Sequence, residues 1–144
     1  MKTKSKYVEW LNADVMHAGS RKWISELQFC SDEQTFFEDM IRLYTLQLID
    51  SKHFNDSKMM VDKLSRIKKK NSDLLNTINL HEKELKVMVD GIDALEEEDL
   101  YKKKHRQLIS EMSTFIKDYR KYKLQLFGLL KTILKEQKQK HLLE

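Results

Sequence analysis

The chain has 144 residues, of which 40% are hydrophobic and 35% are charged, with no proline, three glycines and one cysteine. This length fits one domain that buries a hydrophobic core. The absence of proline argues against turn-rich β and α/β folds, and one cysteine cannot build a disulfide framework. The 27 basic and 23 acidic residues give a net charge of +4, and the cations form short clusters without aromatic platforms, which argues against nucleic-acid binding.

The expected first elements are a short helix over residues 5–18 and a long helix over residues 20–50. Gly19 is expected to separate them, with Ser20 as the N-cap of the second helix. The apolar arc of this long helix has four neighbouring rows, which are Phe29, Phe36 and Leu43; Glu26, Glu33, Met40 and Gln47; Trp23, Cys30, Phe37 and Tyr44; and Leu27, Gln34, Ile41 and Leu48.

Two further long helices are expected over residues 57–90 and 94–140, because apolar residues recur there every three or four positions. Asn55, Asp56 and Ser57 are good N-cap residues for the first of them. Its seam reads Met60, Leu64, Ile67, Asn71, Leu74, Ile78, His81, Leu85, Met88, Ile92 and Leu95. The seam of the last helix reads Tyr101, His105, Leu108, Met112, Phe115, Tyr119, Tyr122, Leu126, Leu129 and Ile133.

The two seams are out of phase, so the chain must break between them. Gly91 after Asp90 favours a stop there, and Asp93 with Glu96 resembles a capping box for the next helix. The alternative break is the acidic run at residues 96–99, which has no glycine. Turn chemistry favours the first position.

These elements predict an all-α protein, an antiparallel bundle of three long helices plus one short N-terminal helix, forming a single domain over residues 1–144. The short helix cannot cover the whole groove between three long helices. The uncovered part, with residues such as Leu43, Met60 and Leu130, is expected to meet a second copy of the chain or a partner helix. The alternative is that the three long helices seal against one another.

Polar residues on the apolar seams are the candidate site. A turn near residue 92 places His81 and His105 in one layer, because facing residues of such a hairpin have numbers that add to about 184. A loop near residues 53–55 brings Glu26 to the same level. Two imidazoles and a carboxylate form a recognised ligand set for one zinc or ferrous ion, so Glu26, His81 and His105 are the candidate metal ligands.

The favoured interpretation of this layer is a charge-assisted hydrogen bond between Glu26 and a core histidine that fixes the helix register, with no cofactor bound. If the chain turned at residues 96–99 instead, His81 would face Met112, a pair that can ligate haem.

Two absences from the sequence bear on function and location. It has no nucleophile motif and no phosphate-binding glycine loop. It also has no signal peptide at residues 1–6 and no apolar run long enough for a membrane span. The sequence therefore predicts a cytoplasmic, non-enzymatic interaction protein that forms a homo-oligomer or binds a partner helix.

Overall fold

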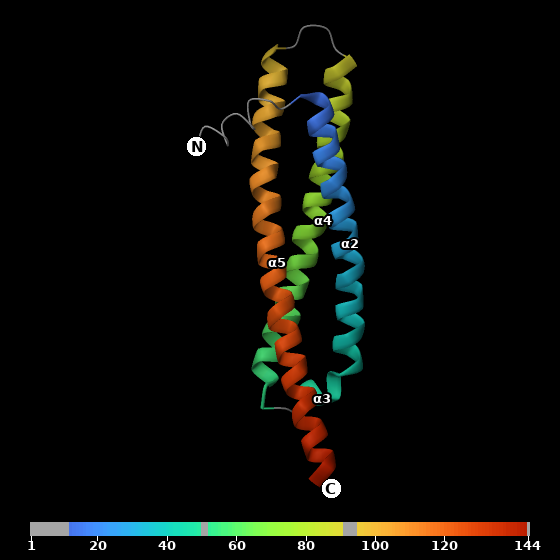
Figure 1. Cartoon of the computed structure of the whole chain (residues 1–144), viewed down its shortest axis with the longest axis vertical. Helices are drawn as coiled ribbons and strands as arrows, with labels where there is room; N and C mark the ends of the chain where they lie inside the picture. The colour runs from blue at the N-terminus through green and yellow to red at the C-terminus, as the bar shows by residue number, and fades with distance from the viewer. Residues whose placement is uncertain (1–11, 50–51, 91–94, 144) are drawn as a thin grey trace. The chain divides into compact units, whose positions relative to one another are not determined.

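The computed structural model describes residues 12–49, 52–90 and 95–143, and every regular element within these ranges is a helix (Figure 1). The helices are α2 (Ala13–Leu43), α3 (Thr45–Ile49), α4 (Phe54–Asp90) and α5 (Leu95–Leu143). The predicted all-α helical bundle is confirmed.

The chain divides into two compact units. Unit 1 comprises residues 1–29 and 71–115, and unit 2 comprises residues 30–70 and 116–144. Each unit contains one stretch of α2, one of α4 and one of α5, and α3 belongs to unit 2. The assignment of residues 1–144 to a single domain stays a prediction.

Within unit 1, α4 is antiparallel to both of its neighbours. The side chain of His81 meets that of His105, while Leu85 packs further along in one cluster with Tyr101 and Met16. Asn71 Nδ2 donates a hydrogen bond to the carbonyl of Leu27 at 3.1 Å. The core of this unit is formed by Met16, Leu27, Leu74, Ile78, Leu85, Tyr101, Leu108, Met112 and Phe115.

Within unit 2, α4 is antiparallel to α5. Tyr122 donates its hydroxyl hydrogen to the carbonyl of Met60, and His53 at the start of α4 meets Glu136 of α5. The core of this unit is formed by Cys30, Phe37, Leu48, Met60, Leu64, Tyr119, Tyr122, Leu126, Leu130 and Ile133. The seams predicted for α4 and α5 supply most of both cores.

The predicted break after Ala18 is wrong, because α2 runs without interruption from Ala13 through Gly19 and Ser20. The helix has its cap earlier in the chain: Asn12 Oδ1 accepts a hydrogen bond from the backbone nitrogen of Val15 at 2.9 Å. A capped helix tolerates one interior glycine at a modest energetic cost. The part of the predicted short helix that precedes Asn12 lies outside the described residues.

Replacing Gly19 with alanine tests this continuity. The added Cβ would lie 3.6 Å from His105 Nε2, an ordinary van der Waals distance, so the space exists. Because alanine is the better helix former, Gly19→Ala should raise the free energy of unfolding by about 0.5–1 kcal/mol in urea denaturation. The same change at Gly128, where a Cβ would meet nothing within 4 Å, serves as the reference. A helix that ended at Gly19 in the left-handed conformation would instead be destabilised by alanine.

The long helix predicted over residues 20–50 ends earlier, at Leu43, and Tyr44 separates it from α3. The next helix starts earlier than predicted. α4 begins at Phe54, because the backbone nitrogen and the hydroxyl of Ser57 both donate to the carbonyl of His53 at 2.9 Å. Ser57 therefore lies inside the first turn and is not the N-cap.

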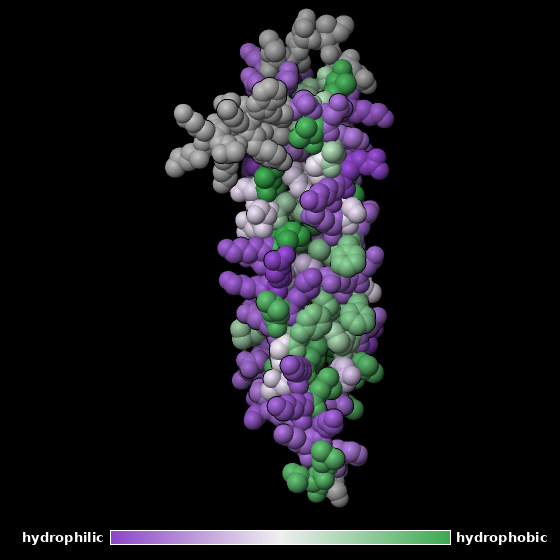
Figure 2. Space-filling view, in the orientation of Figure 1, coloured by the Kyte–Doolittle hydropathy of each residue, from purple (hydrophilic) through white to green (hydrophobic). Residues whose placement is uncertain are grey.

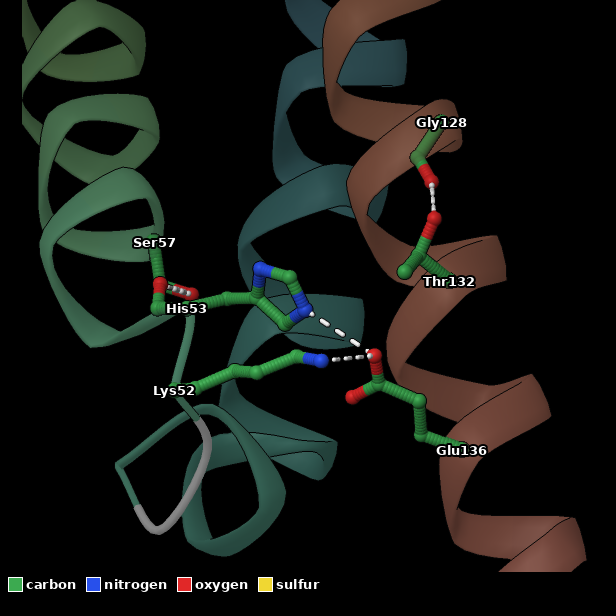
Figure 3. Close-up of polar contacts among 6 residues, drawn as sticks. All are labelled: Lys52, His53, Ser57, Gly128, Thr132 and Glu136. Atoms are coloured by element: carbon green, nitrogen blue, oxygen red, sulfur yellow. Dashed lines mark hydrogen bonds and ion pairs between the residues drawn. The ribbon is translucent and has the colours of Figure 1, made fainter.

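The start of α4 is tied to α5 at Glu136 (Figure 3). Glu136 Oε1 accepts from His53 Nε2 at 3.2 Å and lies 3.4 Å from Lys52 Nζ. The hydrogen bond from His53, followed by the contacts with Lys52, lowers the pKa of Glu136. On α5 itself, Thr132 donates its hydroxyl hydrogen to the carbonyl of Gly128 in the same view (Figure 3).

The chain breaks between α4 and α5 where the favoured prediction places it. α4 ends at Asp90 and α5 begins at Leu95, so the acidic residues 96–99 lie inside α5. The predicted turn residues Gly91 and Asp93 lie outside the described residues. Because His81 faces His105, the alternative pairing of His81 with Met112 is wrong.

The groove predicted around Leu43, Met60 and Leu130 is only partly open. Leu43 is 73% exposed, as expected, but Met60 and Leu130 are buried. Both residues belong to the core of unit 2, where Tyr122 of α5 also donates a hydrogen bond to the carbonyl of Met60.

Candidate functional site

The buried feature of unit 1 is a pair of imidazoles contributed by α4 and α5. His81 Nε2 lies 2.9 Å from His105 Nδ1, a hydrogen bond in which one nitrogen carries the proton and the other accepts it. Both side chains are almost completely excluded from solvent. The antiparallel register of α4 and α5 therefore brings together two of the three predicted ligands.

Aromatic rings enclose this pair. Tyr101 stacks on His81 with ring centroids 4.0 Å apart, and Trp23 stacks on His105 at 4.8 Å. The hydroxyl of Tyr101 donates to the carbonyl of His81 at 3.0 Å. Gly19 lies where α2 passes the imidazole of His105, close enough that an added Cβ would be 3.6 Å from His105 Nε2.

Burial decides the charge of the pair. Desolvation lowers the pKa of His81 to about 4, with smaller contributions from His105 and Lys104 of the same sign. Desolvation likewise lowers the pKa of His105 to about 4. Both imidazoles are therefore neutral at pH 7, and the hydrogen bond between them is neutral rather than charge-assisted.

Glu26 does not join the two histidines. Its side chain is 38% exposed, and its carboxylate lies 4.0 Å from Lys22 Nζ one turn earlier on α2. No group of three His, Cys, Asp or Glu side chains within the described ranges is placed to hold a metal ion. The expected charge-assisted bond from Glu26 to a core histidine is also not formed, because the Glu26 side chain is partly exposed beside Lys22 on α2 while both imidazoles are buried.

The carboxylate that meets a histidine in unit 1 is Glu82. Its Oε2 lies 2.6 Å from His17 Nδ1, and the side chain of His17 is 53% exposed. The sequence pattern did not indicate this pair, because Glu82 follows the seam residue His81 and reads as a surface position. His17 lies inside α2.

In unit 2 a tyrosine and a lysine of α5 converge on Glu33. Tyr119 donates its hydroxyl hydrogen to Glu33 Oε1 at 2.9 Å, and Lys123 Nζ lies 3.2 Å from the same oxygen. Burial, followed by this hydrogen bond to Glu33, raises the pKa of Tyr119. These contacts determine which side of α2 faces α5 within unit 2.

One exposed apolar feature among the described residues is a row of two phenylalanines and a leucine on α2, which we call the aromatic row. Phe29, Phe36 and Leu43 are 64%, 60% and 73% exposed, although the sequence pattern placed them in the apolar arc. The buried residues come from the two rows at the opposite edge of the arc, namely Cys30 and Phe37 of one row and Leu27, Gln34 and Leu48 of the other. Figure 2 shows hydrophobic side chains gathered on one face over the part of α2 that Figure 1 colours teal.

A shallow apolar groove lies on another side of unit 2, where the end of α2 and α3 meet α4. Its volume is about 330 Å³, and its walls include Ile41, Ile49, Phe54 and Val61. Ile49 and Phe54 are themselves half exposed. Unit 2 therefore presents apolar side chains to solvent on two sides of α2.

Comparisons of the chain with protein-family models, with curated proteins and with solved structures gave no match. None of the described helices combines the length and the apolar character that a membrane crossing requires. The fold and the site together define a helical bundle with a neutral buried imidazole pair and an exposed apolar surface.

Proposed function

We propose that this protein is a non-enzymatic interaction protein whose helical bundle associates, through the aromatic row of α2, with a partner helix or a second copy of the chain. The observation that carries the proposal is the exposure of Phe36 and Leu43, which share one row of α2 within unit 2. Fully burying one such side chain is favourable by about 1.5–3 kcal/mol, so a row of them favours association.

The proposed location is the cytoplasm. The support is the cysteine count, because a chain with one cysteine cannot build a disulfide framework of its own, which suits a reducing compartment. The non-enzymatic role is supported by the sequence, which has no nucleophile motif and no phosphate-binding glycine loop.

Photo-crosslinking tests the proposed surface. A photoreactive benzoylphenylalanine at position 36 should give crosslinked products severalfold more abundant than the same residue at Leu80, which is similarly exposed at 56% but lies on α4. Leu43→Asp should remove the products formed from position 36, because it places a charge in the same row. Equal crosslinking from positions 36 and 80 would contradict the proposal.

A further inference from the structure

We infer that the occupant of the aromatic row is a second copy of this chain, bound in a parallel two-fold dimer through one face of unit 2. This inference rests on the proposed function and adds the identity and orientation of the partner. We call this surface the α2/α5 face, and its apolar residues are Phe36, Met40 and Leu43 of α2 and Phe127 and Leu134 of α5.

Contacts within unit 2 place the two helices side by side. The rings of Phe37 and Phe127 meet edge to face with centroids 5.5 Å apart, and Glu33 is bound to Lys123. Phe36 precedes Phe37 on α2 and is 60% exposed, and Phe127 is 45% exposed. The apolar strip is therefore continuous from α2 to α5.

The two edges of this face carry opposite charges. On α2, Asp32 and Asp39 lie four residues before and three residues after Phe36, on the side turned away from Glu33. On α5, Arg120 and Lys131 lie seven residues before and four residues after Phe127. All four side chains are exposed.

These charges are largely uncommitted. Asp32, Arg120 and Lys131 form no ion pair with another described residue, and Asp39 meets only the exposed Arg42 at 3.6 Å. An acidic edge, an apolar centre and a basic edge make a surface that is complementary to itself.

The charge pattern also selects the orientation of the two copies. A two-fold axis parallel to the helices lays α2 of one copy on α5 of the other and leaves every residue at its own level along the axis. Glu33 contacts both Tyr119 and Lys123, and Phe37 contacts both Tyr119 and Phe127. Taken together, these contacts put Asp32 near the level of Arg120 of the second copy. Asp39 lies about one helical turn before Lys131, whose long side chain can reach back to it. An axis perpendicular to the helices would place α2 on α2 and oppose aspartate with aspartate.

A charge-swap experiment on the full chain tests this dimer, with its mass measured by light scattering and its dissociation constant by sedimentation equilibrium. Asp39→Lys and Lys131→Glu should each weaken dimerisation about tenfold, because each rim pair occurs twice in a symmetric dimer. The double variant Asp39→Lys with Lys131→Glu should restore the wild-type constant. Lys69→Glu, an equal charge change at an exposed position of α4, should leave it unchanged.

Three outcomes would overturn the inference. The wild-type chain could stay monomeric at about 100 μM, a concentration well above the dissociation constants of stable dimers. The single charge reversals could leave the dissociation constant unchanged, or the double variant could fail to restore it. Phe36→Ser separates these failures from failure of the proposed function. If it abolishes association while the charge swap has no effect, the aromatic row is still the docking surface and only the orientation is wrong. If it associates as the wild type does, both proposals fail.

Discussion

Replacing Phe37 with alanine is expected to lower the free energy of unfolding by about 3–5 kcal/mol, the range for emptying a large buried aromatic site. Phe37 is 1% exposed, and its ring contacts those of Tyr119 and Phe127. The loss combines the apolar surface removed from the core with the cavity that its neighbours cannot fill. Urea denaturation followed by circular dichroism at low protein concentration measures the change.

Phe36 supplies a matched control for this substitution, because it is the adjacent residue with the same side chain. Since Phe36 is 60% exposed, Phe36→Ala should change the free energy of unfolding by less than about 1 kcal/mol. Comparable losses for the two variants would mean that α2 is rotated about its axis relative to the structure, with the aromatic row in the core.

This pair of residues shows what periodicity can and cannot predict. Most seam residues predicted for α4 and α5 within the described ranges are buried, because each of these seams spans a smaller arc than the four rows of α2. The arc of α2 is four rows wide, and a helix with two neighbours buries only part of such an arc. Which rows enter the core depends on where those neighbours lie. Periodicity within α2 holds no information about that.

The candidate site was predicted in part for a similar reason. The register of α4 against α5 can be counted from the break between Asp90 and Leu95, so His81 and His105 were placed in one layer correctly. The register of α2 depends on the connection that contains α3, which the pattern did not show. As a result His17 lies opposite Glu82, while Glu26, which was expected at this level, is half exposed.

Acidification from pH 7 to pH 4 is expected to destabilise the protein through the imidazole pair. The pKa of each histidine is lowered from 6.5 to about 4 in the folded chain, so the unfolded chain takes up protons first. The free energy of unfolding is therefore at its full value above pH 6.5, and it decreases as the pH falls from 6.5 towards 4. For one histidine, a pKa shift of this size corresponds to a loss of unfolding free energy on the order of 3 kcal/mol on acidification. Because the two histidines share a hydrogen bond, their two contributions are not simply additive.

Urea denaturation at pH 7, 6, 5 and 4.5 measures this dependence. The double variant His81→Leu with His105→Leu removes both groups and should lose most of the slope between pH 6.5 and 4.5. His17→Gln is the control, because it removes a histidine that faces Glu82 at the surface of unit 1 and keeps the buried pair.

Other charged groups also lie near the imidazole pair, so the pH at which stability is lost must identify the group responsible. Lys104, Glu82 and Glu84 contribute electrostatically to His81 or to Tyr101. Histidine is the only side chain whose ordinary pKa lies between pH 5 and 8. A loss of stability that begins near pH 6.5 therefore belongs to histidine. The slope above pH 5 could instead persist in the double leucine variant and disappear in His17→Gln. In that case the slope comes from His17, and the buried imidazoles do not control the acid stability of the protein.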